Sequence, residues 1–526
     1  MRNASHPWKL LLMSAALGLW SGCSLALDFT ECTSDETCQA LQTPGERLIC
    51  GPDQRCIEDP SLKVIEPCQE HHHCLVDGAT PRLCHFSSQR CVAIDTERCP
   101  TLLLPSAGLP AGSAVLGAVV DVGPAFSANA NGALNALRLA HDEFSRNAAL
   151  PGGARAGVVV CSSTGSLEST RQAANHLVVE LGLPALLTAL TSSHILAITG
   201  ELALPRERLF VSPWAHAAAL AAYDDSALLW RLTTSDLYHA AALADRIAAR
   251  APTRVVAFAK DDLYGEALHS AITAALPELS WHSVAYPAPD AYPDAGQRRQ
   301  AYQSRVDDAM SALANADLVL FLGTTEAVEL MLMVDQALQS AGTATPFYLF
   351  SHGALPALPE AIRQSRDANL ARVEAVGPLV ANGDAHAAFA QRFRDRFGGD
   401  PPAGGGLVYD ATTTLLLALC ALPTARSATG LTLSHTLPRL ADPNAGLPLS
   451  VATGDFAARA CTHLAGEGSI ALTGATASLD FAANGHLRDD LGAYQIEKRS
   501  GDYFLRAVQR FVLSPGPQPG GTWQAL

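Results

Sequence analysis

The chain has 526 residues, of which 48% are hydrophobic and 17% are charged, and its formal net charge is −15. This composition excludes a disordered chain, and the length allows about three or four domains. The negative charge and the lack of a basic cluster exclude a nucleic-acid binder, because affinity for phosphates depends on patches of Lys and Arg.

Residues 1–22 have the organisation of an export signal. Basic residues precede an apolar stretch, 10–20, that is too short to span a bilayer. Ser21-Gly22-Cys23 then resembles the cleavage box of bacterial lipoprotein signals, although Trp20 stands where that box usually has Leu. We expect a lipid on Cys23 that anchors the protein to a membrane. The alternative is an ordinary secretory signal that leaves Cys23 for a disulfide.

The residue after Cys23 bears on the choice of membrane. Ser24 stands where an acidic residue would, in the same resemblance, indicate retention at the inner membrane. We therefore expect the protein in the cell envelope, at the outer membrane and in the periplasm. No other stretch of the sequence is long and apolar enough to span a bilayer.

Residues 23–100 form a cysteine-rich region, which indicates an oxidising compartment. A repeat is visible as C-x5-C-x11-C-x5-C followed by C-x5-C-x9-C-x6-C. Each copy is too short for a sufficient core, so disulfides must constrain it. We expect two bridges within each copy, with the pairing left open because spacing does not determine it. The candidates are Cys32, Cys38, Cys50 and Cys56, then Cys68, Cys74, Cys84 and Cys91.

Other cysteines and histidines raise questions of pairing and metal binding. Cys420 and Cys461 lie in predicted helices and are candidates for a further bridge, whereas Cys161 ends a strand and is expected to be a buried thiol. His71-His72-His73 beside Cys74 resembles a zinc-ligand cluster, but the first copy of the repeat has no histidines there. A solvated turn is the better interpretation, and we expect no metal site and no cofactor.

The large domain follows a stretch rich in Pro and Gly, 101–113, which we interpret as a linker. Apolar strands then alternate with amphipathic helices, a pattern that predicts parallel sheets with right-handed crossovers. Two successive runs of this pattern predict two α/β lobes.

Residues 183–216 are the unit around which we expect a binding site. A first apolar strand ends at Thr191-Ser192-Ser193, a helix follows, and a second strand ends at Ser212-Pro213-Trp214. Hydroxyl groups therefore follow two strands. In open parallel sheets, ligands bind at the carboxyl ends of the strands.

Several short motifs, taken in order, resemble a known family. They are Asp121-Val122-Gly123-Pro124, Ser192-Ser193, Ser212-Pro213-Trp214-Ala215-His216, Asp262-Leu263-Tyr264-Gly265, Tyr409-Asp410-Ala411 and the stretch 477–485. Over 113–506 the chain resembles type I periplasmic binding proteins of the branched-chain amino-acid branch, which serve ABC importers. The resemblance implies an α/β fold with two doubly wound parallel-sheet lobes, joined by a three-crossover hinge and preceded by the small disulfide-rich region.

The implied lobes are interleaved along the chain. Lobe one would take 114–230 and 351–455, lobe two would take 231–350 and 456–510, and 511–526 would be a tail.

The resemblance also implies an amino-acid site between the lobes. Its implied ligand-binding residues are Ser192, Ser193, Ser212, Trp214, Ala215, His216, Tyr264 and Glu326. The hydroxyls and backbone N–H groups would bind a carboxylate, Glu326 would bind an α-ammonium group, and Tyr264 would cover the ligand. Trp214 and His216 depart from the small residue and the Thr that many relatives have, so the ligand stays open.

Each of these assignments has a structural alternative. Ser192 and Ser193 can be no more than a helix N-cap, and Glu326 can complement the helix dipole from a first turn. His216 can be a solvated loop residue.

The expected function is capture of a small, amino-acid-like ligand, for an ABC permease or for sensing. We find no hydrolase, zinc-protease, P-loop or dinucleotide motif, so no catalytic residue is assigned. Two alternatives stay open. One is a surface sensor or interaction protein with a degenerate cleft, and the other is a hydrolase that uses Ser193 or Ser212.

Overall fold

The computed structural model divides into two compact units, Met1–Lys63 with Asp77–Thr80 and Val64–Val76 with Pro81–Leu526. The described residues are 32–39, 48–52, 54–58, 67–75, 80–106, 108–123, 127–292, 294–365, 367–379, 383–402, 404–444, 446–482, 485–514 and 519–526. The predicted signal peptide and Cys23 lie outside them. Within these ranges, no helix has both the length and the apolar character needed to cross a membrane.

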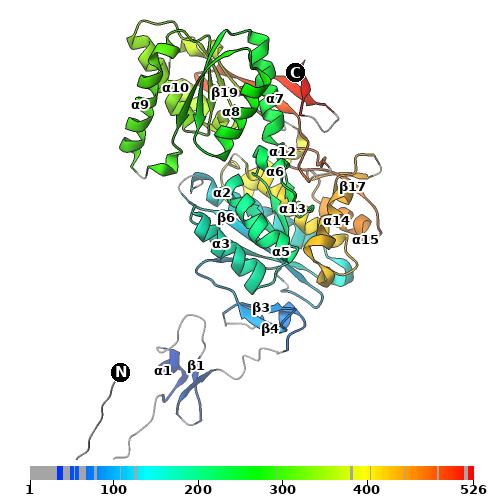
Figure 1. Cartoon of the computed structure of the whole chain (residues 1–526). Helices are drawn as coiled ribbons and strands as arrows, with labels where there is room; N and C mark the ends of the chain where they lie inside the picture. The colour runs from blue at the N-terminus through cyan, green and yellow to red at the C-terminus, as the bar shows by residue number, and fades with distance from the viewer. Residues whose placement is uncertain are drawn as a thin grey trace, which may run out of the picture. The chain divides into compact units, whose positions relative to one another are not determined.

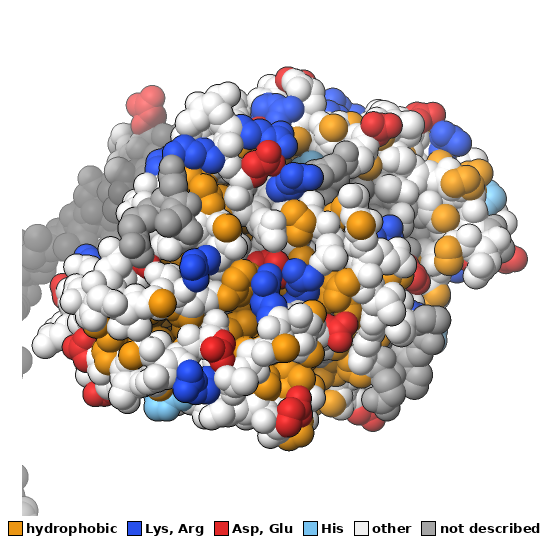
Figure 2. Space-filling view, turned by 90° about the horizontal axis from the view of Figure 1, so that it is seen from above, with side chains coloured by type: hydrophobic (Ala, Val, Ile, Leu, Met, Phe, Trp, Pro, Cys, Tyr) orange, Lys and Arg blue, Asp and Glu red, His pale blue; other side chains and the backbone are white. Residues whose placement is uncertain are grey.

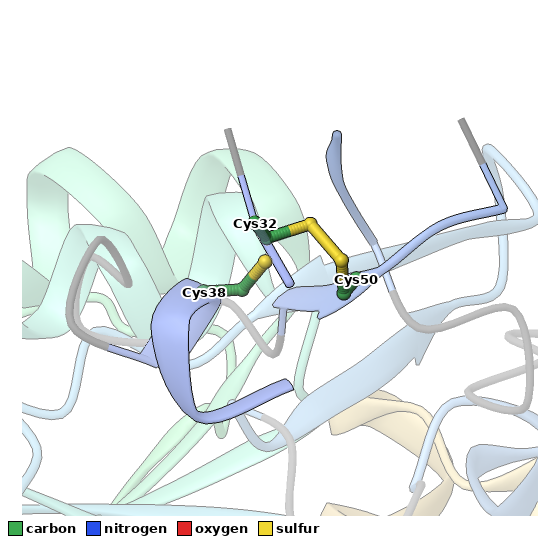
Figure 3. A group of neighbouring side chains, drawn as sticks. All are labelled: Cys32, Cys38 and Cys50. Atoms are coloured by element: carbon green, nitrogen blue, oxygen red, sulfur yellow. A yellow bond between two sulfur atoms is a disulfide. The ribbon is translucent and has the colours of Figure 1, made fainter. Parts of the chain in front are cut away.

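The first unit is held together by disulfides. Helix α1 (Asp35–Gln39) and the antiparallel strands β1 (Leu48–Cys50) and β2 (Cys56–Glu58) are its regular elements. Cys32 pairs with Cys50, as Figure 3 shows, and the neighbouring Cys38 pairs with Cys56. The expectation of two bridges within this copy is confirmed, and crosslinks replace the apolar core that so short a segment lacks.

The second cysteine copy belongs to the large unit. It contains the 3-10 turn η1 (His71–His73) and the antiparallel strands β3 (Arg82–His85) and β4 (Arg90–Ala93), with bridges Cys68–Cys84 and Cys74–Cys91. Again both bridges lie within the copy, as predicted. The histidine turn is only partly solvated, because His71 is buried against Phe86 and burial lowers its pKa to about 4.

Lobe one is built on a six-stranded sheet with the order β10-β9-β8-β6-β7-β5. Five strands are parallel and the edge strand β5 runs antiparallel to β7. The strands are β5 (Thr101–Leu103), β6 (Ala114–Asp121), β7 (Ala156–Ser163), β8 (Ala185–Ala189), β9 (Leu209–Ser212) and β10 (Leu229–Arg231). All eight residues of β6 are buried, as expected for a central strand covered on both faces.

Two findings correct the predictions at the start of lobe one. Thr101–Leu103 lies in the sheet as β5, so the linker is shorter than the predicted 101–113. Cys161 is not a free thiol, because it forms a disulfide with Cys99. The sequence does not reveal the strand, because three residues are too few to show a periodicity. It does not reveal the disulfide, because the two cysteines are far apart in the chain.

Helices cover both faces of the lobe-one sheet (Figure 1). One face packs against α2 (Ser127–Asn147), α12 (Asp384–Phe397), α13 (Gly405–Cys420), α14 (Gly430–Leu440) and α15 (Phe456–Ala465). The other packs against α3 (Leu167–Asn175), η3 (His176–Glu180), α4 (Ser192–Ile198) and η4 (Thr199–Ala203), with α5 (Leu204–Arg206) and α6 (Ala218–Ala221) alongside. The Cys420–Cys461 bridge, a candidate from the sequence, joins α13 to α15.

Lobe two is built on an eight-stranded sheet with the order β12-β11-β13-β14-β15-β18-β19-β20. Its first five strands are parallel and its last three are antiparallel. The strands are β11 (Arg254–Lys260), β12 (Ser280–Tyr286), β13 (Leu318–Leu322), β14 (Phe347–Phe350), β15 (Val373–Pro378), β18 (Leu491–Arg499), β19 (Asp502–Leu513) and β20 (Gly521–Ala525). Ser500 and Gly501 both have positive φ, which is the turn that matches hairpin twist between β18 and β19.

The faces of the second sheet are covered by different helices (Figure 1). Helices α9 (Ala295–Leu313), α10 (Ala327–Ser340) and α11 (Leu358–Gln364) pack on one face, and α7 (Asp236–Arg250) and α8 (Leu263–Ala275) pack on the other. The face shown in Figure 2 carries basic, acidic and hydrophobic side chains among neutral ones.

The strand pairing moves three of the predicted lobe boundaries. Residues 351–378 belong to lobe two, because β15 pairs with β14. Helix α15 and strand β17 (Ile470–Thr473), which pairs with β16 (Leu447–Ser450), pack in lobe one. The predicted tail is part of the second sheet, since β20 pairs with β19.

Three chain passages connect the lobes and are hydrogen-bonded to one another. They lie between β10 and α7, between β15 and α12, and between β17 and β18. The N–H of Arg231 donates to Gly485 and the N–H of Leu487 donates back to Arg231, each at 2.8 Å. The N–H of Leu379 donates to Asp490 at 3.1 Å. The predicted three-crossover arrangement is therefore present.

A buried carboxylate ties α7 to the second sheet. Glu374 of β15 is fully buried and accepts hydrogen bonds from Arg246 at 2.7 Å and from Arg250 at 2.9 Å. Because both cations would lose their partner together, we expect Glu374→Ala to lower the free energy of unfolding by about 3–5 kcal/mol.

Urea denaturation of the full chain measures this change. The matched control is Glu360→Ala, which removes an exposed carboxylate paired with Arg363 and is expected to cost less than about 1 kcal/mol. Equal effects of the two substitutions would contradict the assignment.

Candidate functional site

The serine loop after β8 is organised by a threonine. Thr191 caps α4 by accepting from the N–H of His194 at 3.4 Å, so neither Ser192 nor Ser193 is the N-cap. The Ser192 hydroxyl accepts from the N–H of Ala217 at 3.3 Å, which joins this loop to the one after β9. The Ser193 side chain is exposed and contacts Thr191 Oγ1 at 3.2 Å. The two predicted serines are thus placed differently, one in a loop contact and one at the surface.

The loop after β9 is held by a buried hydroxyl. Ser212 is fully buried, donates to the carbonyl of Thr188 at 3.2 Å and accepts from the N–H of Ala215 at 3.1 Å. Ala215 is also fully buried, and Trp214 packs against the lobe-one core with its Nε1 donating to the carbonyl of Gly404 at 3.4 Å. These three residues shape the loop that presents His216.

His216 lies where the two lobes meet. Its Nδ1 is 3.0 Å from Asp236 Oδ2, and its Nε2 is 3.2 Å from Nε2 of His352, a residue of lobe two. Its side chain is 24% exposed, so the interpretation as a solvated loop residue is wrong.

Tyr264 packs edge-on against the rings of His216 and His352, each at 5.2 Å between centroids. Asp262 positions it by capping α8, accepting from the N–H groups of Tyr264 and Gly265. Gly265 is required there, because a Cβ would lie 2.2 Å from the carbonyl oxygen of Lys260. Burial and the charge of Asp236 raise the pKa of the Tyr264 hydroxyl well above its usual value.

Glu326 is buried at the end of β13 and is already hydrogen-bonded. Its carboxylate accepts from Tyr286 Oη at 2.9 Å, from the N–H of Thr324 at 2.8 Å and from the Thr324 hydroxyl. It is the residue before the first turn of α10, and its side chain does not cap that helix. These contacts fix the position of Glu326 within lobe two, at the same edge of the parallel sheet as the loops after β11 and β14.

Three residues of this region were not assigned from the sequence. Asp236 and His239 lie in the first turn of α7 with the spacing i, i+3 that places them on one face. His352 follows the carboxyl end of β14. We call His216, Asp236, His239, Tyr264 and His352 the interlobe cluster. Sequence reasoning could have selected His352, because it lies just after a predicted strand. It could not have selected Asp236 and His239, because they follow a crossover and belong to no recognisable motif.

Burial governs the protonation of the interlobe cluster. Burial lowers the pKa of His239 to about 3, and burial together with His239, His216 and Lys260 lowers the pKa of His352 well below its usual value. Both rings are therefore neutral at neutral pH. The distances fit a chain in which Tyr264 donates to His352, His352 to His216, and His216 to Asp236.

The other family-like motifs have structural roles. Tyr409 Oη donates to Glu143 at 2.6 Å. Asp410, which is 1% exposed, accepts from the N–H groups of Ala475 and Thr476 at 2.6 and 2.9 Å, and from the Thr476 hydroxyl. Asp410 therefore holds the start of the third crossover, directly after β17. Burial raises its pKa to about 6 despite these donors.

This raised pKa predicts a pH dependence of stability. The stabilisation that Asp410 provides is complete below its ordinary pKa of 3.8 and is lost as pH rises through about 6. The stability of the natural protein relative to Asp410→Asn should thus fall by up to about 3 kcal/mol between about pH 4 and pH 7. Urea denaturation of both proteins at several pH values measures it, and a difference that does not change with pH would contradict it.

The sequence was then compared with known proteins. A family model described as a periplasmic binding protein matches residues 114–479. The chain belongs to the periplasmic binding protein family. Membership implies an extracytoplasmic location and the binding of solutes. A comparison with curated proteins gives no match.

Solved structures share the fold of this periplasmic binding protein. A leucine binding protein LivK from Thermotoga maritima is 17% identical, with a TM-score of 0.56, over 75% of this chain and 98% of its own. The substrate binding protein LivJ from Streptococcus pneumoniae, solved with isoleucine, is 13% identical, with a TM-score of 0.55, over 75% and 99%. A solute binding protein from Rhodopseudomonas palustris, solved with 3,4-dihydroxy benzoic acid, is 13% identical, with a TM-score of 0.57, over 77% and 99%. The expected fold class is confirmed, and the different ligands mean that the fold does not set the ligand.

Proposed function

We propose that this protein is an exported solute-binding lipoprotein that captures a small ligand, of the amino-acid type or a related metabolite, between its lobes. The observation that carries the proposal is the meeting of strand-end loops from both lobes. His216 follows β9 of lobe one, whereas Tyr264 and His352 follow β11 and β14 of lobe two. Ligands of open parallel sheets bind at these carboxyl ends.

The hinge supports the same proposal. Three hydrogen-bonded crossovers allow the lobes to open and close about one region, which is how two-lobed binding proteins enclose a ligand. In this structure the lobes touch through His216 and His352. A ligand between the strand ends would be bound by Ser192 and the His216 loop on one side and by Tyr264 and Glu326 on the other.

Glu326 favours the amino-acid class. It supplies a buried carboxylate for an ammonium group, and its charge adds to burial and to the charge of Asp236 in raising the pKa of the Tyr264 hydroxyl. Delivery to an ABC permease, or sensing, and a lipid anchor at Cys23 complete the proposal.

The hydrolase alternative has less support. The Ser193 hydroxyl contacts Thr191, and the Ser212 hydroxyl is bonded to two backbone groups. A serine nucleophile needs an adjacent general base, and neither set of contacts includes one.

A ligand screen tests the proposed function. The mature chain is heated with amino acids and with small aromatic acids, and a true ligand at 100 times its Kd should add about 2.7 kcal/mol of stability. Calorimetry then measures the affinity of Glu326→Gln and Tyr264→Phe, both of which should bind an amino-acid ligand at least tenfold more weakly.

The matched control is His282→Ala, an exposed residue of the outer strand β12, which should bind normally. A ligand whose affinity is the same in all three variants would place the site elsewhere and contradict the proposal. No stabilisation by any compound would favour the sensor with a degenerate cleft.

A further inference from the structure

Within the interlobe cluster, three side chains bring ligand-type atoms together. One atom each of His216, Asp236 and His352 lies within 4.8 Å of the other two. Their closest contacts involve both nitrogens of His216 and both oxygens of Asp236. They are 3.0 Å between His216 Nδ1 and Asp236 Oδ2, 3.2 Å between the Nε2 atoms of the two histidines, and 4.0 Å between His352 Nε2 and Asp236 Oδ1. His216 comes from a lobe-one loop, Asp236 from the start of a helix and His352 from the end of a lobe-two strand. Only the tertiary fold brings these three residues together.

The 4.8 Å limit that includes one ligand atom from each residue is close to the ligand spacing around a tetrahedral metal ion. Zinc binds imidazole nitrogen and carboxylate oxygen at about 2.0–2.2 Å, which puts neighbouring ligand atoms about 3.3 Å apart. Small rotations of the rings would bring the three atoms to this spacing.

Unpartnered buried atoms point to the same site independently. Asp236 is 1% exposed, and its Oδ1 has no hydrogen-bond partner among the described residues, while it lies 4.0 Å from His352 Nε2. His239 is fully buried, and neither of its ring nitrogens has a partner in the described part of the chain. Its ring centroid is 4.2 Å from that of His352. Buried polar atoms without partners destabilise a fold, and a bound cation would give such atoms a partner.

The surrounding charges allow a cation. Asp236 supplies a carboxylate, and Glu326 lies near Tyr264. The positive charge of Lys260 contributes to lowering the pKa of His352 after burial and the two other histidines, and its ammonium group is paired with Asp262 at 2.9 Å. Tyr264 Oη is 3.4 Å from His352 Nδ1, so it can orient that ring as outer-shell partners of metal-bound histidines do.

We propose that His216, Asp236 and His352 bind a divalent transition metal ion of the zinc type. Two imidazoles and one carboxylate favour Zn²⁺ and its transition-metal neighbours over Mg²⁺ and Ca²⁺, which prefer oxygen ligands. The fourth position is open to His239, to water or to an acidic group of a solute. Because His216 belongs to lobe one and His352 to lobe two, the ion fastens the lobes together. This inference does not depend on the identity of the organic ligand.

Other clusters of cysteine or histidine in the described residues are less suited to bind a metal ion. The clusters Cys32-Cys38-Cys50 and Cys68-Cys74-Cys84 have the right spacing, but their sulfurs are in disulfides and supply no thiolate. The tandem histidines of η1 are the competing adventitious site, since His72 and His73 are partly or fully exposed.

Metal titration of the mature chain without a histidine tag tests the proposal. After removal of metal with EDTA, calorimetry with Zn²⁺ should show one equivalent bound, Co²⁺ should give the visible absorption of a four-coordinate site, and Mg²⁺ should give neither. His216→Gln and Asp236→Asn should each weaken Zn²⁺ binding at least tenfold and abolish the Co²⁺ band. Circular dichroism verifies that both variants are folded.

The matched control is His72→Ala with His73→Ala, which should bind Zn²⁺ as the natural protein does. Zn²⁺ binding that is lost in this control, or unchanged in both His216→Gln and Asp236→Asn, would overturn the proposal, as would a lack of binding to the natural protein. The titration contains no organic ligand, so its failure is separate from failure of the ligand screen.

Discussion

The hydrogen bonds among the three crossovers are the constraint on which the functional geometry depends. Arg231 is bonded on both sides to the segment at Gly485 and Leu487, and Leu379 is bonded to Asp490. These bonds hold three chain passages together between the sheets. As a consequence, the carboxyl ends of the parallel strands of both lobes face one region, and loops that are far apart in sequence meet there.

Polar side chains from both lobes are buried in that region, and some of their hydrogen-bonding atoms have no partner among the described residues. Tyr264, His352 and His216 form a hydrogen-bonded chain that ends on Asp236. Burial lowers the pKa of His239 and of His352, because a charged ring there would lose its hydration. Such a set of neutral rings and a carboxylate suits recognition of a cation or of a polar solute better than it suits a packed core.

The positions of individual residues show how far sequence reasoning reached. Strand alternation predicted two lobes, and the family resemblance carried by the motif order implied three crossovers and the placement of His216 and Tyr264 beside the junction. The motif search also selected Ser212 and Ala215, whose burial makes them supports of the loop. It missed Asp236 and His239, because a crossover followed by a helix start has no distinctive periodicity. The predicted linker failed at the short strand β5, and the predicted lobe boundaries failed at β15 and β20, because local periodicity does not encode which strands pair.

The sequence by itself determined the local chemistry: the disulfide repeats, the strand and helix pattern, and the hydroxyl and aromatic residues at strand ends. Those features depend on neighbours within a few tens of residues, so periodicity and spacing report them. The tertiary structure alone decided the Cys99–Cys161 bridge, the inclusion of β20 in the sheet and the approach of His352 to His216. Contacts between such distant segments arise from sheet order and crossover pairing, which local patterns do not encode.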